Sequence, residues 1–366
     1  LQPIATDLFG TLSYYLHMIL QSGDEAQLLA PSGDLSEANV RTTIESALKR
    51  QSDGFLKVVG LWTPPATPTA DPFGQQQPSL KQYTTIAEQL RQDYTVQPVD
   101  LTTGQVPVDV DVLVVVAPQA MTERERYAID QYLMRGGSIV LAAGNYALNP
   151  DPMTGDLGVQ QVEEGLRDML LSYGIDVQQA MVMDPQNEPF PVQVARNVGG
   201  LQVREIQAMN YPFFVDVRAN GMDKDSPILA SVPAVTMNWV SPVVVADGDE
   251  ETGRAVTTLL RSSPGSWLRT NTDIQPNTQL YPETGFPVEG EPQSYPLAVS
   301  VQGVFDSYFK DKPIPSAEAP ATGDPEAPES SVVPTDTVGT LVQSPESARL
   351  VVIGSAEFLN DIVFQL

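Results

Sequence analysis

The chain has 366 residues with a hydrophobic fraction of 42%, so it can bury a core and is not disordered throughout. At roughly 150 residues per domain, this length predicts two domains or one large domain with an appendage. The 20 basic and 46 acidic side chains give a formal net charge of −26, which opposes binding to nucleic acid and direct adsorption to anionic lipid.

Residue types needed for several kinds of catalytic or metal site are missing. Cysteine is absent and His17 is the single histidine, which excludes disulfides, thiolate nucleophiles, Cys-ligated metals and multi-histidine zinc sites. We predict no metal and no cofactor, and a structural or surface role for His17. No segment reaches the roughly 18 apolar residues of a membrane span. Because the chain begins without Met or a signal sequence, we interpret it as a soluble piece cut from a larger protein.

The first part of the chain predicts helices around short strands. Helical spacing of apolar residues predicts helices at Leu8–Leu20, Ser36–Arg50 and Tyr83–Tyr94. Strands are expected at Phe55–Trp62 and Thr95–Val99. Between them, Thr63–Pro78 is rich in Pro, Gly and Gln, which predicts a long irregular loop at the C-terminal end of a strand.

A strand–helix–strand unit follows and has the clearest boundaries. The almost uninterrupted apolar run Asp111–Ala117 predicts a strand covered on both faces. Thr122 and Glu125 have the spacing of a capping box, which predicts a helix that ends at Gly136-Gly137. The residues that this helix is expected to bury are Ile129, Tyr132 and Leu133. Ser138–Ala143 is the next strand, and strands that alternate with helices imply right-handed crossovers and a parallel sheet.

After this unit the alternation fades. Val162–Tyr173 is expected to form a helix, and Ile175–Asp184 to carry a strand. Pro189–Pro233 is β- and loop-like. Later strands are expected at Pro242–Ala246, Thr257–Arg261, Tyr295–Val304 and Arg349–Ile353, the last two placed to rejoin the sheet. Lys312–Thr337 is rich in Pro, Ala, Glu and Ser without periodicity, which predicts a disordered or extended insertion.

These patterns divide the chain into four segments. We predict an α/β sheet domain in residues 1–185, a β-rich elaboration in 186–311, a Pro-rich flexible insertion in 312–337, and a closing strand with the start of a membrane-proximal segment in 338–366. The expected fold class is α/β, with a mainly parallel, Rossmann-like sheet flanked by helices.

The best candidate for a ligand or partner crevice is the edge of the sheet at which its parallel strands end. The turn Gly144-Asn145-Tyr146 follows one strand, and Thr63 and Pro118 follow two others. Trp267, which closes the stretch Ser263-Pro-Gly-Ser-Trp267, completes the candidate set. The competing interpretation is that these residues form ordinary strand-to-loop turns.

Other motifs indicate no specific chemistry. The acidic stretch Asp247–Glu251 lacks the ligand spacing of a calcium loop and is interpreted as a solvated turn. The serines around Ser263 have no nucleophile elbow and no imidazole near them in sequence, and no phosphate-binding glycine motif is present. Trp62, Trp239 and Trp267 could form a stacking platform for sugar or peptide, or anchor the core.

Residues 111–144, DVLVVVAPQAMTERERYAIDQYLMRGGSIVLAAG, resemble the hallmark segment of the GldG-type auxiliary subunits of ABC transport systems. The shared pattern is an apolar strand, a Pro, a Glu-rich cap, a Tyr-x-Ile-Asp-x-Tyr-Leu-x-x-Gly-Gly helix end and a second apolar strand. Other segments similar to the family are Gly10–Tyr15 followed by Glu37–Lys49, Pro227–Pro242, Leu259–Trp267 and Arg349–Asn360. At Ser355-Ala356-Glu357 the chain departs from the family's Gly-Asp-Ser-Asp-Phe-Leu turn.

The resemblance implies an extracytoplasmic domain, anchored by transmembrane helices outside this chain, beside an ABC-2-type permease and an ATPase. It would couple binding of a cell-surface polysaccharide or a partner protein to the transporter, and relatives are involved in gliding motility or export. The family fold is similar to class I glutamine amidotransferase-like domains. In those enzymes a Cys at the turn after a central strand attacks the substrate. The comparable turn here, Ala143-Gly144-Asn145, offers no thiol or hydroxyl.

The preferred hypothesis is therefore a non-catalytic, extracytoplasmic interaction domain of an ABC-type system. One alternative is a hydrolase of the amidotransferase-like fold, or a glycosidase that uses carboxylate pairs such as Asp184 with Glu188 or Glu163 with Glu164. A second alternative is a structural spacer of a surface layer, which the acidity and the Pro-rich tract would permit.

Overall fold

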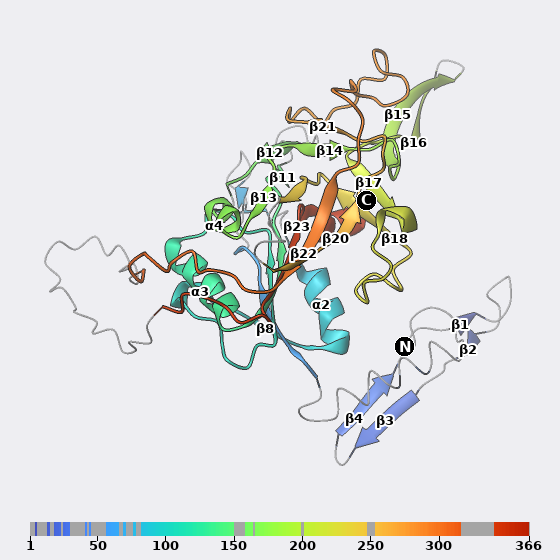
Figure 1. Ribbon diagram of the computed structural model, residues 1–366. Coiled ribbons are helices and arrows are strands. Elements are labelled where there is room, and N and C mark those ends of the chain that lie inside the picture. Colours follow the sequence, from blue (N-terminus) through green and yellow to red (C-terminus); the bar gives the residue numbers. More distant parts are fainter. Residues whose placement is uncertain are drawn as a thin grey trace, which may run out of the picture.

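The structure is a computed structural model that describes residues 56–65, 82–149, 158–163, 165–190, 208–246, 253–315 and 340–364 in full, together with the backbone of some other helical and strand residues outside these ranges (Figure 1). Before residue 56 it describes two antiparallel pairs, β1 (Ile4–Ala5) with β2 (Ser13–Tyr14) and β3 (Met18–Ser22) with β4 (Glu25–Leu29). The helix predicted at Leu8–Leu20 is wrong where these strands lie. The sequence between β3 and β4, Gly23-Asp24, is a pair that favours a hairpin over a continuing helix.

Some features singled out in the sequence fall outside the described residues. They are His17, the acidic stretch Asp247–Glu251 and most of the insertion Lys312–Thr337. Of the helix predicted at Ser36–Arg50, Arg41 and Ile44 are helical and the other residues are not described.

A seven-stranded sheet forms the centre of the molecule, with the order β20-β22-β23-β10-β9-β5-β8 (Figure 1). Its members are β5 (Val58–Trp62), β8 (Thr95–Pro98), β9 (Val112–Val116), β10 (Ser138–Ala142), β20 (Ala255–Arg261), β22 (Pro296–Gln302) and β23 (Arg349–Ile353). The strands from β23 to β8 are parallel, and β22 is antiparallel to both of its neighbours. The prediction of a mixed α/β fold with a mainly parallel sheet is confirmed, and the two late strands rejoin the sheet as β22 and β23.

The order of the parallel strands contains a change of direction. From β5 the chain moves out to the edge strand β8, then returns to the other side of β5 to form β9, β10 and finally β23. Parallel strands need crossover connections, and the helices in these connections cover the faces of the sheet. The carboxyl ends of β5 and β9 are therefore neighbours from which the chain departs toward opposite sides.

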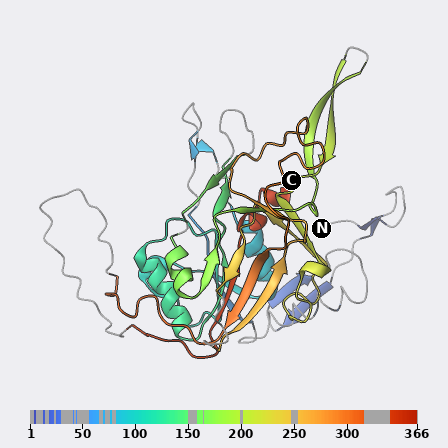
Figure 2. The same cartoon turned by 45° about the horizontal axis from the view of Figure 1, so that its top comes forward.

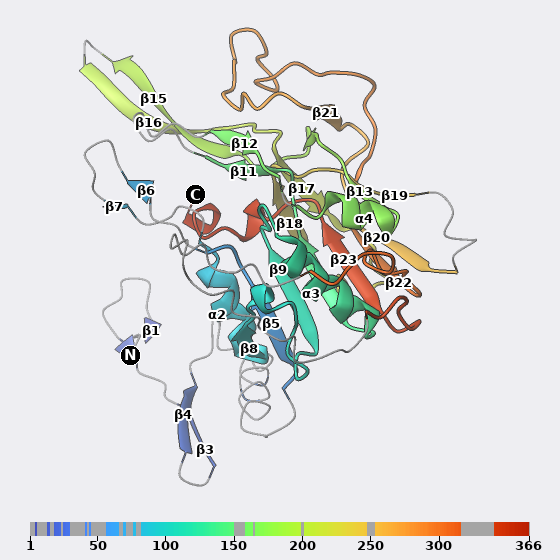
Figure 3. The ribbon, with the colours of Figure 1, turned by 90° about the vertical axis from the view of Figure 1, so that its left-hand side faces the viewer.

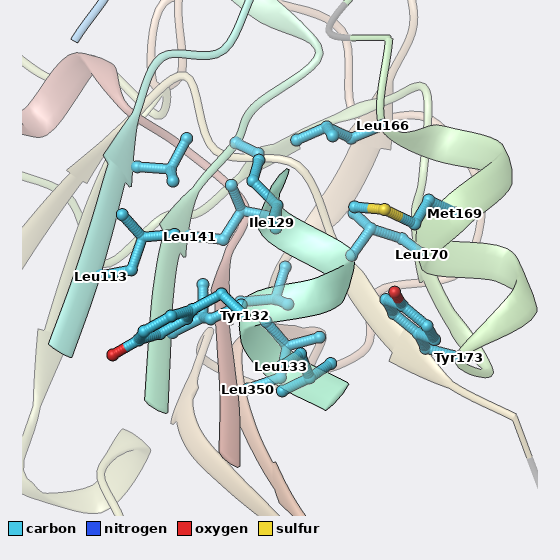
Figure 4. Close-up of a cluster of buried hydrophobic side chains, with 14 of the residues drawn as sticks. Leu113, Ile129, Tyr132, Leu133, Leu141, Leu166, Met169, Leu170, Tyr173 and Leu350 are labelled. Atoms are coloured by element: carbon cyan, nitrogen blue, oxygen red, sulfur yellow. The ribbon is translucent and has the colours of Figure 1, made fainter. Parts of the chain in front are cut away.

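In the described part of the chain, three helices cover the parallel strands: α2 (Thr84–Asp93), α3 (Glu123–Met134) and α4 (Arg167–Ser172). Side chains alternate between the two faces along a strand. Leu113 of β9 accordingly belongs to the core shared with α3 and α4, whereas Val114 packs against the core beneath α2. Figure 4 shows the inward side chains of α3, which are Ile129, Tyr132 and Leu133, close to the strands and to α4. Figure 3 views these helices and the sheet from the side.

The boundaries of α3 agree with the sequence prediction. The Thr122 hydroxyl accepts the Glu125 amide, and the Glu125 carboxylate accepts the Thr122 amide at 2.8 Å, which completes the capping box. The chain leaves α3 through Gly136, whose φ of +89° lies in the left-handed region. By contrast, α4 begins at Arg167 rather than at Val162, because Gly165 has a φ of +74° that a helix does not accommodate.

Antiparallel ribbons and 3-10 turns make up the remaining elements of the described chain. The ribbons are β6 (Thr69–Ala70) with β7 (Gln76–Gln77), β11 (Tyr146–Leu148) with β12 (Val159–Gln161), β13 (Ile175–Val177) with β19 (Val243–Val245), β14 (Met181–Met183) with β21 (Trp267–Arg269), β15 (Phe190–Val198) with β16 (Leu201–Met209), and β17 (Phe214–Arg218) with β18 (Ala234–Asn238). The turns are η1 (Leu101–Thr103), η2 (Ala219–Gly221), η3 (Glu357–Leu359) and η4 (Val363–Gln365). The pair β6–β7 lies within Thr63–Pro78, which the sequence predicts to be wholly irregular. The hairpin β15–β16 extends away from the sheet (Figure 2).

The carboxylate of Asp130 connects α3 to two other parts of the core. It is fully buried, and it accepts hydrogen bonds from the Tyr173 hydroxyl (2.6 Å), the Ser307 hydroxyl (2.7 Å), the Tyr308 amide (2.8 Å) and the Gln131 side-chain amide (2.8 Å). Burial, and then the charge of Asp130, raise the pKa of the Tyr173 phenol well above its ordinary value, so this hydroxyl remains a donor. Asp130 therefore ties α3 to the end of α4 and to the loop after β22.

Asp130→Ala should lower the free energy of unfolding by at least about 3 kcal/mol, because it leaves buried hydroxyl and amide donors without an acceptor. Ser307→Ala removes a single donor and should cost only about 1 kcal/mol. Urea unfolding followed by tryptophan fluorescence measures both values. Equal and small losses for the two variants would contradict the role assigned to Asp130.

Candidate functional site

The carboxyl ends of β5, β9, β10 and β23 lie side by side along one edge of the sheet, which we call the carboxyl edge. In open α/β sheets ligands bind outside this edge where the strand order reverses, and here that point lies between β5 and β9. Thr63, partly exposed, follows β5 directly, and the buried Pro118 lies two residues beyond β9. The structure therefore places these two predicted residues at the ends of neighbouring strands.

The turn after β9 has a strained backbone. Ala117 and Ala120 have φ values of +50° and +46°, in the left-handed region, where a residue with a Cβ costs about 1–3 kcal/mol. The Ala117 amide donates to the Ala142 carbonyl at 2.9 Å, and the Ala120 amide donates to the Glu163 carbonyl at 2.7 Å. These bonds hold the strained turn against β10 and against the segment before α4.

Residues 144–146, which follow Ala143 after the end of β10, contact neighbouring backbone. Gly144 lies against the segment after β23, since a Cβ at this position would stand 2.9 Å from the Gly354 carbonyl oxygen. Asn145 and Tyr146 are buried, and both donate hydrogen bonds to the end of β13 or to the residues directly after it. Asn145 donates its amide to the carbonyls of Val177 (3.0 Å) and Gln178 (2.9 Å), and Tyr146 donates its hydroxyl to that of Gln179 (3.1 Å). These two side chains therefore fix local structure.

Trp267 lies in a buried aromatic cluster rather than at an exposed rim. This aromatic cluster consists of Tyr146, Tyr211, Phe213, Phe214, Trp239, Trp267 and Phe286 with adjoining aliphatic residues. Trp62 belongs to the core around α3. Each of the three tryptophans is at most 9% exposed, so they anchor the interior and do not form an exposed stacking platform.

The chain's own carboxylate occupies the N-terminus of α2, which lies at the carboxyl edge. Tyr83, the residue before α2, packs with Ala117, Ala142 and Ala356 beyond the ends of the strands. The Asp361 carboxylate accepts the Thr84 amide at 3.0 Å, the Thr85 amide at 2.9 Å and the Thr84 hydroxyl. Free amides at a helix N-terminus form an anion site, and here Asp361 fills that site from 277 residues away.

The ionisation of this group follows from its contacts. Burial alone would raise the pKa of the Asp361 carboxyl, but the hydrogen bonds from Thr84 and Thr85 outweigh burial and hold the pKa below its ordinary value of 3.8. Burial, and then the charges of Glu357 and Asp361, raise the pKa of the Tyr83 phenol well above its ordinary value. Tyr83 therefore stays neutral at physiological pH and is not available as a base.

The turn after β23 is held by side chains of the same segment. The Ser355 hydroxyl donates to the Asn238 carbonyl at 2.7 Å and accepts the Glu357 amide at 3.1 Å. The Glu357 carboxylate is 1% exposed and accepts the side-chain amide of Asn360 at 3.1 Å. The hydroxyl of Ser355 is therefore engaged with the backbone, and Glu357 is packed inside.

Of the two carboxylate pairs considered for hydrolysis, Asp184 with Glu188 joins a buried and an exposed carboxylate, and Glu163 with Glu164 lies partly outside the described residues. Asp184 is fully buried and accepts the Ser263 hydroxyl at 2.6 Å, the Ser263 amide at 2.7 Å and the Gln186 amide at 2.8 Å. Glu188 is exposed, and Glu164 is outside the described residues. Among the described residues no group of three or more His, Cys, Asp or Glu side chains is arranged to hold a metal ion.

The sequence interpretation missed the residues that close the carboxyl edge, which are Tyr83, Glu357 and Asp361. One local signal existed. The position before α2 is Tyr83, which makes no side-chain cap, and the first turn of α2 has no acidic residue. The first amides of a helix without its own cap are left for water, a ligand or an acceptor from elsewhere in the chain.

Asp361→Ala should lower the free energy of unfolding by about 1–2 kcal/mol at pH 7, because α2 loses its cap. The folded pKa of Asp361 lies below its unfolded value, so its contribution is present above pH 3.8 and is lost as the pH falls through the folded pKa. The difference between wild type and variant should therefore shrink toward pH 3 in denaturant titrations. Glu88→Ala, an exposed change on the same helix, should stay within about 0.5 kcal/mol. A difference that does not change with pH would contradict the assignment.

Comparisons with known proteins give one curated relative and two solved structures. An uncharacterized protein of Borreliella burgdorferi is 23% identical over 207 residues, which are 56% of this chain and 38% of that protein. The mmIFT52 N-terminal domain is 13% identical, with 83% of this chain and 99% of that chain covered and a TM-score of 0.36. A ThuA-like protein from Bacteroides uniformis is 14% identical, with 67% and 76% covered and a TM-score of 0.34. At these TM-scores neither structure bears on function.

A family model described as an ABC-type uncharacterized transport system matches residues 57–366. This range begins one residue before β5 and contains every strand of the seven-stranded sheet. It also contains the capping box of α3 and the Gly136-Gly137 exit, on which the resemblance to the auxiliary subunits rests. No helix in the described part of the chain is both long and apolar enough to cross a membrane. The chain belongs to the family of auxiliary proteins of ABC-type transport systems.

Proposed function

We propose that this chain is a non-catalytic interaction domain that couples binding of a surface ligand or a partner protein to an ABC transporter. Its partners would be an ABC-2-type permease and an ATPase of the same system. Membership of the auxiliary family over residues 57–366 supports this proposal. The proposal also includes an extracytoplasmic position, a tether of transmembrane helices, a fold like the amidotransferase-like domains, and a part in gliding motility.

The main support for a non-catalytic role is that side chains of the protein itself occupy the carboxyl edge. Nucleophilic catalysis needs a nucleophile with an activating base within hydrogen-bond reach. At the described carboxyl edge the Ser355 hydroxyl and the Asn145 amide bind backbone carbonyls, and Asp361 caps α2. A domain whose polar side chains already hold its own backbone is suited to binding through its surface rather than to bond-making.

The test uses the full-length protein in its native membranes. An affinity tag on the protein, followed by mild cross-linking and detergent extraction, should recover the permease and the ATPase in constant proportion. Protease added to intact cells, or to spheroplasts, should cut the domain if it lies outside the cytoplasm. Recovery of neither transport protein, with the tagged protein intact, would contradict the proposal.

A separate measurement addresses catalysis. The purified domain should show no turnover above a heat-denatured control with panels of peptides, esters and glycans. Turnover that falls at least about 100-fold with a single change at the carboxyl edge, such as Asp361→Asn or Ser355→Ala, would show that the hydrolase alternative is correct.

A further inference from the structure

A long connection at one end of the molecule has the features of an interaction surface. Residues 270–295 join β21 to β22, are described throughout, and contain no helix or strand. Connections longer than about 12–15 residues without secondary structure are uncommon in compact domains, and ordered ones are usually functional. In Figures 1 and 3 this connection, drawn in orange, leaves the body near the base of the hairpin β15–β16.

Two buried residues anchor the connection to the aromatic cluster. Ile274 and Phe286 are each 2% exposed. The Tyr211 hydroxyl donates to the Ile274 carbonyl at 3.0 Å, and the ring of Phe286 meets that of Phe213 edge-on at 5.0 Å between centroids. Asn210, just after β16, donates to the Glu283 carbonyl at 3.4 Å. The connection is thus fixed to the base of the hairpin.

Residues 277–288, which we call the tip loop and which include the anchor Phe286, are ordered by their own backbone. The Asn277 amide donates to the Gly285 carbonyl at 2.7 Å, and the Gly285 amide donates to the Tyr281 carbonyl at 2.8 Å. The Tyr281 amide donates to the Asn277 carbonyl at 2.9 Å. A loop ordered in this way loses little conformational entropy when a partner binds.

The tip loop exposes apolar side chains within an acidic surrounding. Leu280 is 69% exposed, Val288 53% and Tyr281 36%, although Phe286 between them is buried. All four charged residues of 270–295 are acidic and exposed, namely Asp273, Glu283, Glu289 and Glu291. Arg269 pairs with Glu289 at 3.0 Å, which leaves the other three without an ion pair among the described residues.

We propose that the tip loop is a protein-docking surface that accepts a partner surface with an apolar centre and a rim of Lys and Arg. That the partner is the permease rests on the proposed function. The apolar and basic character of the partner's contact surface follows from the side chains of the tip loop and its surroundings. Charge complementarity steers such an encounter, and the net charge of −26 extends the attraction beyond the contact. The same acidic side chains repel anionic headgroups, which disfavours a lipid surface as the occupant.

A photo-crosslinking amino acid at Leu280 of the full-length protein in native membranes tests the surface. The matched control carries it at Val108, which is 93% exposed and lies before β9. Illumination should give an adduct from position 280, at least about tenfold stronger than from position 108, with a permease surface that carries Lys or Arg. An adduct with a surface that lacks basic residues, or equal adducts from both positions, would overturn the proposal.

Substitutions separate this proposal from the proposed function. Leu280→Ser and Glu283→Lys should each reduce co-purification of the permease at least about tenfold, while Val108→Ser and Glu88→Lys leave it unchanged. Unchanged co-purification in all four variants overturns the docking surface and leaves the proposed function standing. An adduct from position 280 with a basic surface of a protein outside the transport system supports the docking surface and overturns the assignment of the permease as its occupant. Binding of the purified domain to vesicles of phosphatidylcholine and phosphatidylglycerol, lost in Leu280→Ser, would replace the protein partner with lipid and overturn the proposal.

Discussion

The contact between the Asp361 carboxylate and the first amides of α2 closes the carboxyl edge of the sheet. The sheet order brings the start of α2 to the place where a doubly wound protein would hold an anionic ligand. Asp361 supplies that anion permanently from the chain itself. The fold therefore keeps the geometry of a binding edge, but the Asp361 carboxylate already balances the partial positive charge at the N-terminus of α2. This filled edge supports the proposal that the domain acts through surface contacts.

Two other carboxylates are also held by hydrogen-bond donors of the protein itself. Asp130 and Asp184 are fully buried, and each is surrounded by hydroxyl and amide donors in place of a Lys or Arg among its described hydrogen-bond partners. A buried carboxylate is tolerated when several donors satisfy its oxygens. In a chain with 46 acidic and 20 basic residues, donors from the backbone and from Ser, Thr and Tyr allow acids to serve as internal connectors. Other described acids, such as Glu283 in the tip loop, are exposed at the surface.

Local signals explain which parts of the fold could be predicted from sequence. The capping box at Thr122 and the glycine exit at Gly136 lie next to α3, and they predicted its boundaries correctly. The apolar residues of Leu8–Leu20 are compatible with either a helix or a strand. The residues of β3 form a strand because they pair with β4, the next strand in the chain. The missing cap at the start of α2 was a local signal, but it does not identify Asp361, whose contact with Thr84 lies 277 residues away. The sequence places Asn145 and Tyr146 after β10, but their bonds to the end of β13 and to the residues after it depend on tertiary structure.

Amide hydrogen exchange at Thr84 and Thr85 tests most directly whether the chain itself closes this edge. If Asp361 holds both amides in solution, they should exchange at least about 100-fold more slowly than in an unstructured peptide, and Asp361→Ala should abolish this protection. Exchange of these two amides at the unstructured rate in the wild-type protein would show that the N-terminus of α2 is open, and it would contradict the account of an edge filled by the protein's own carboxylate.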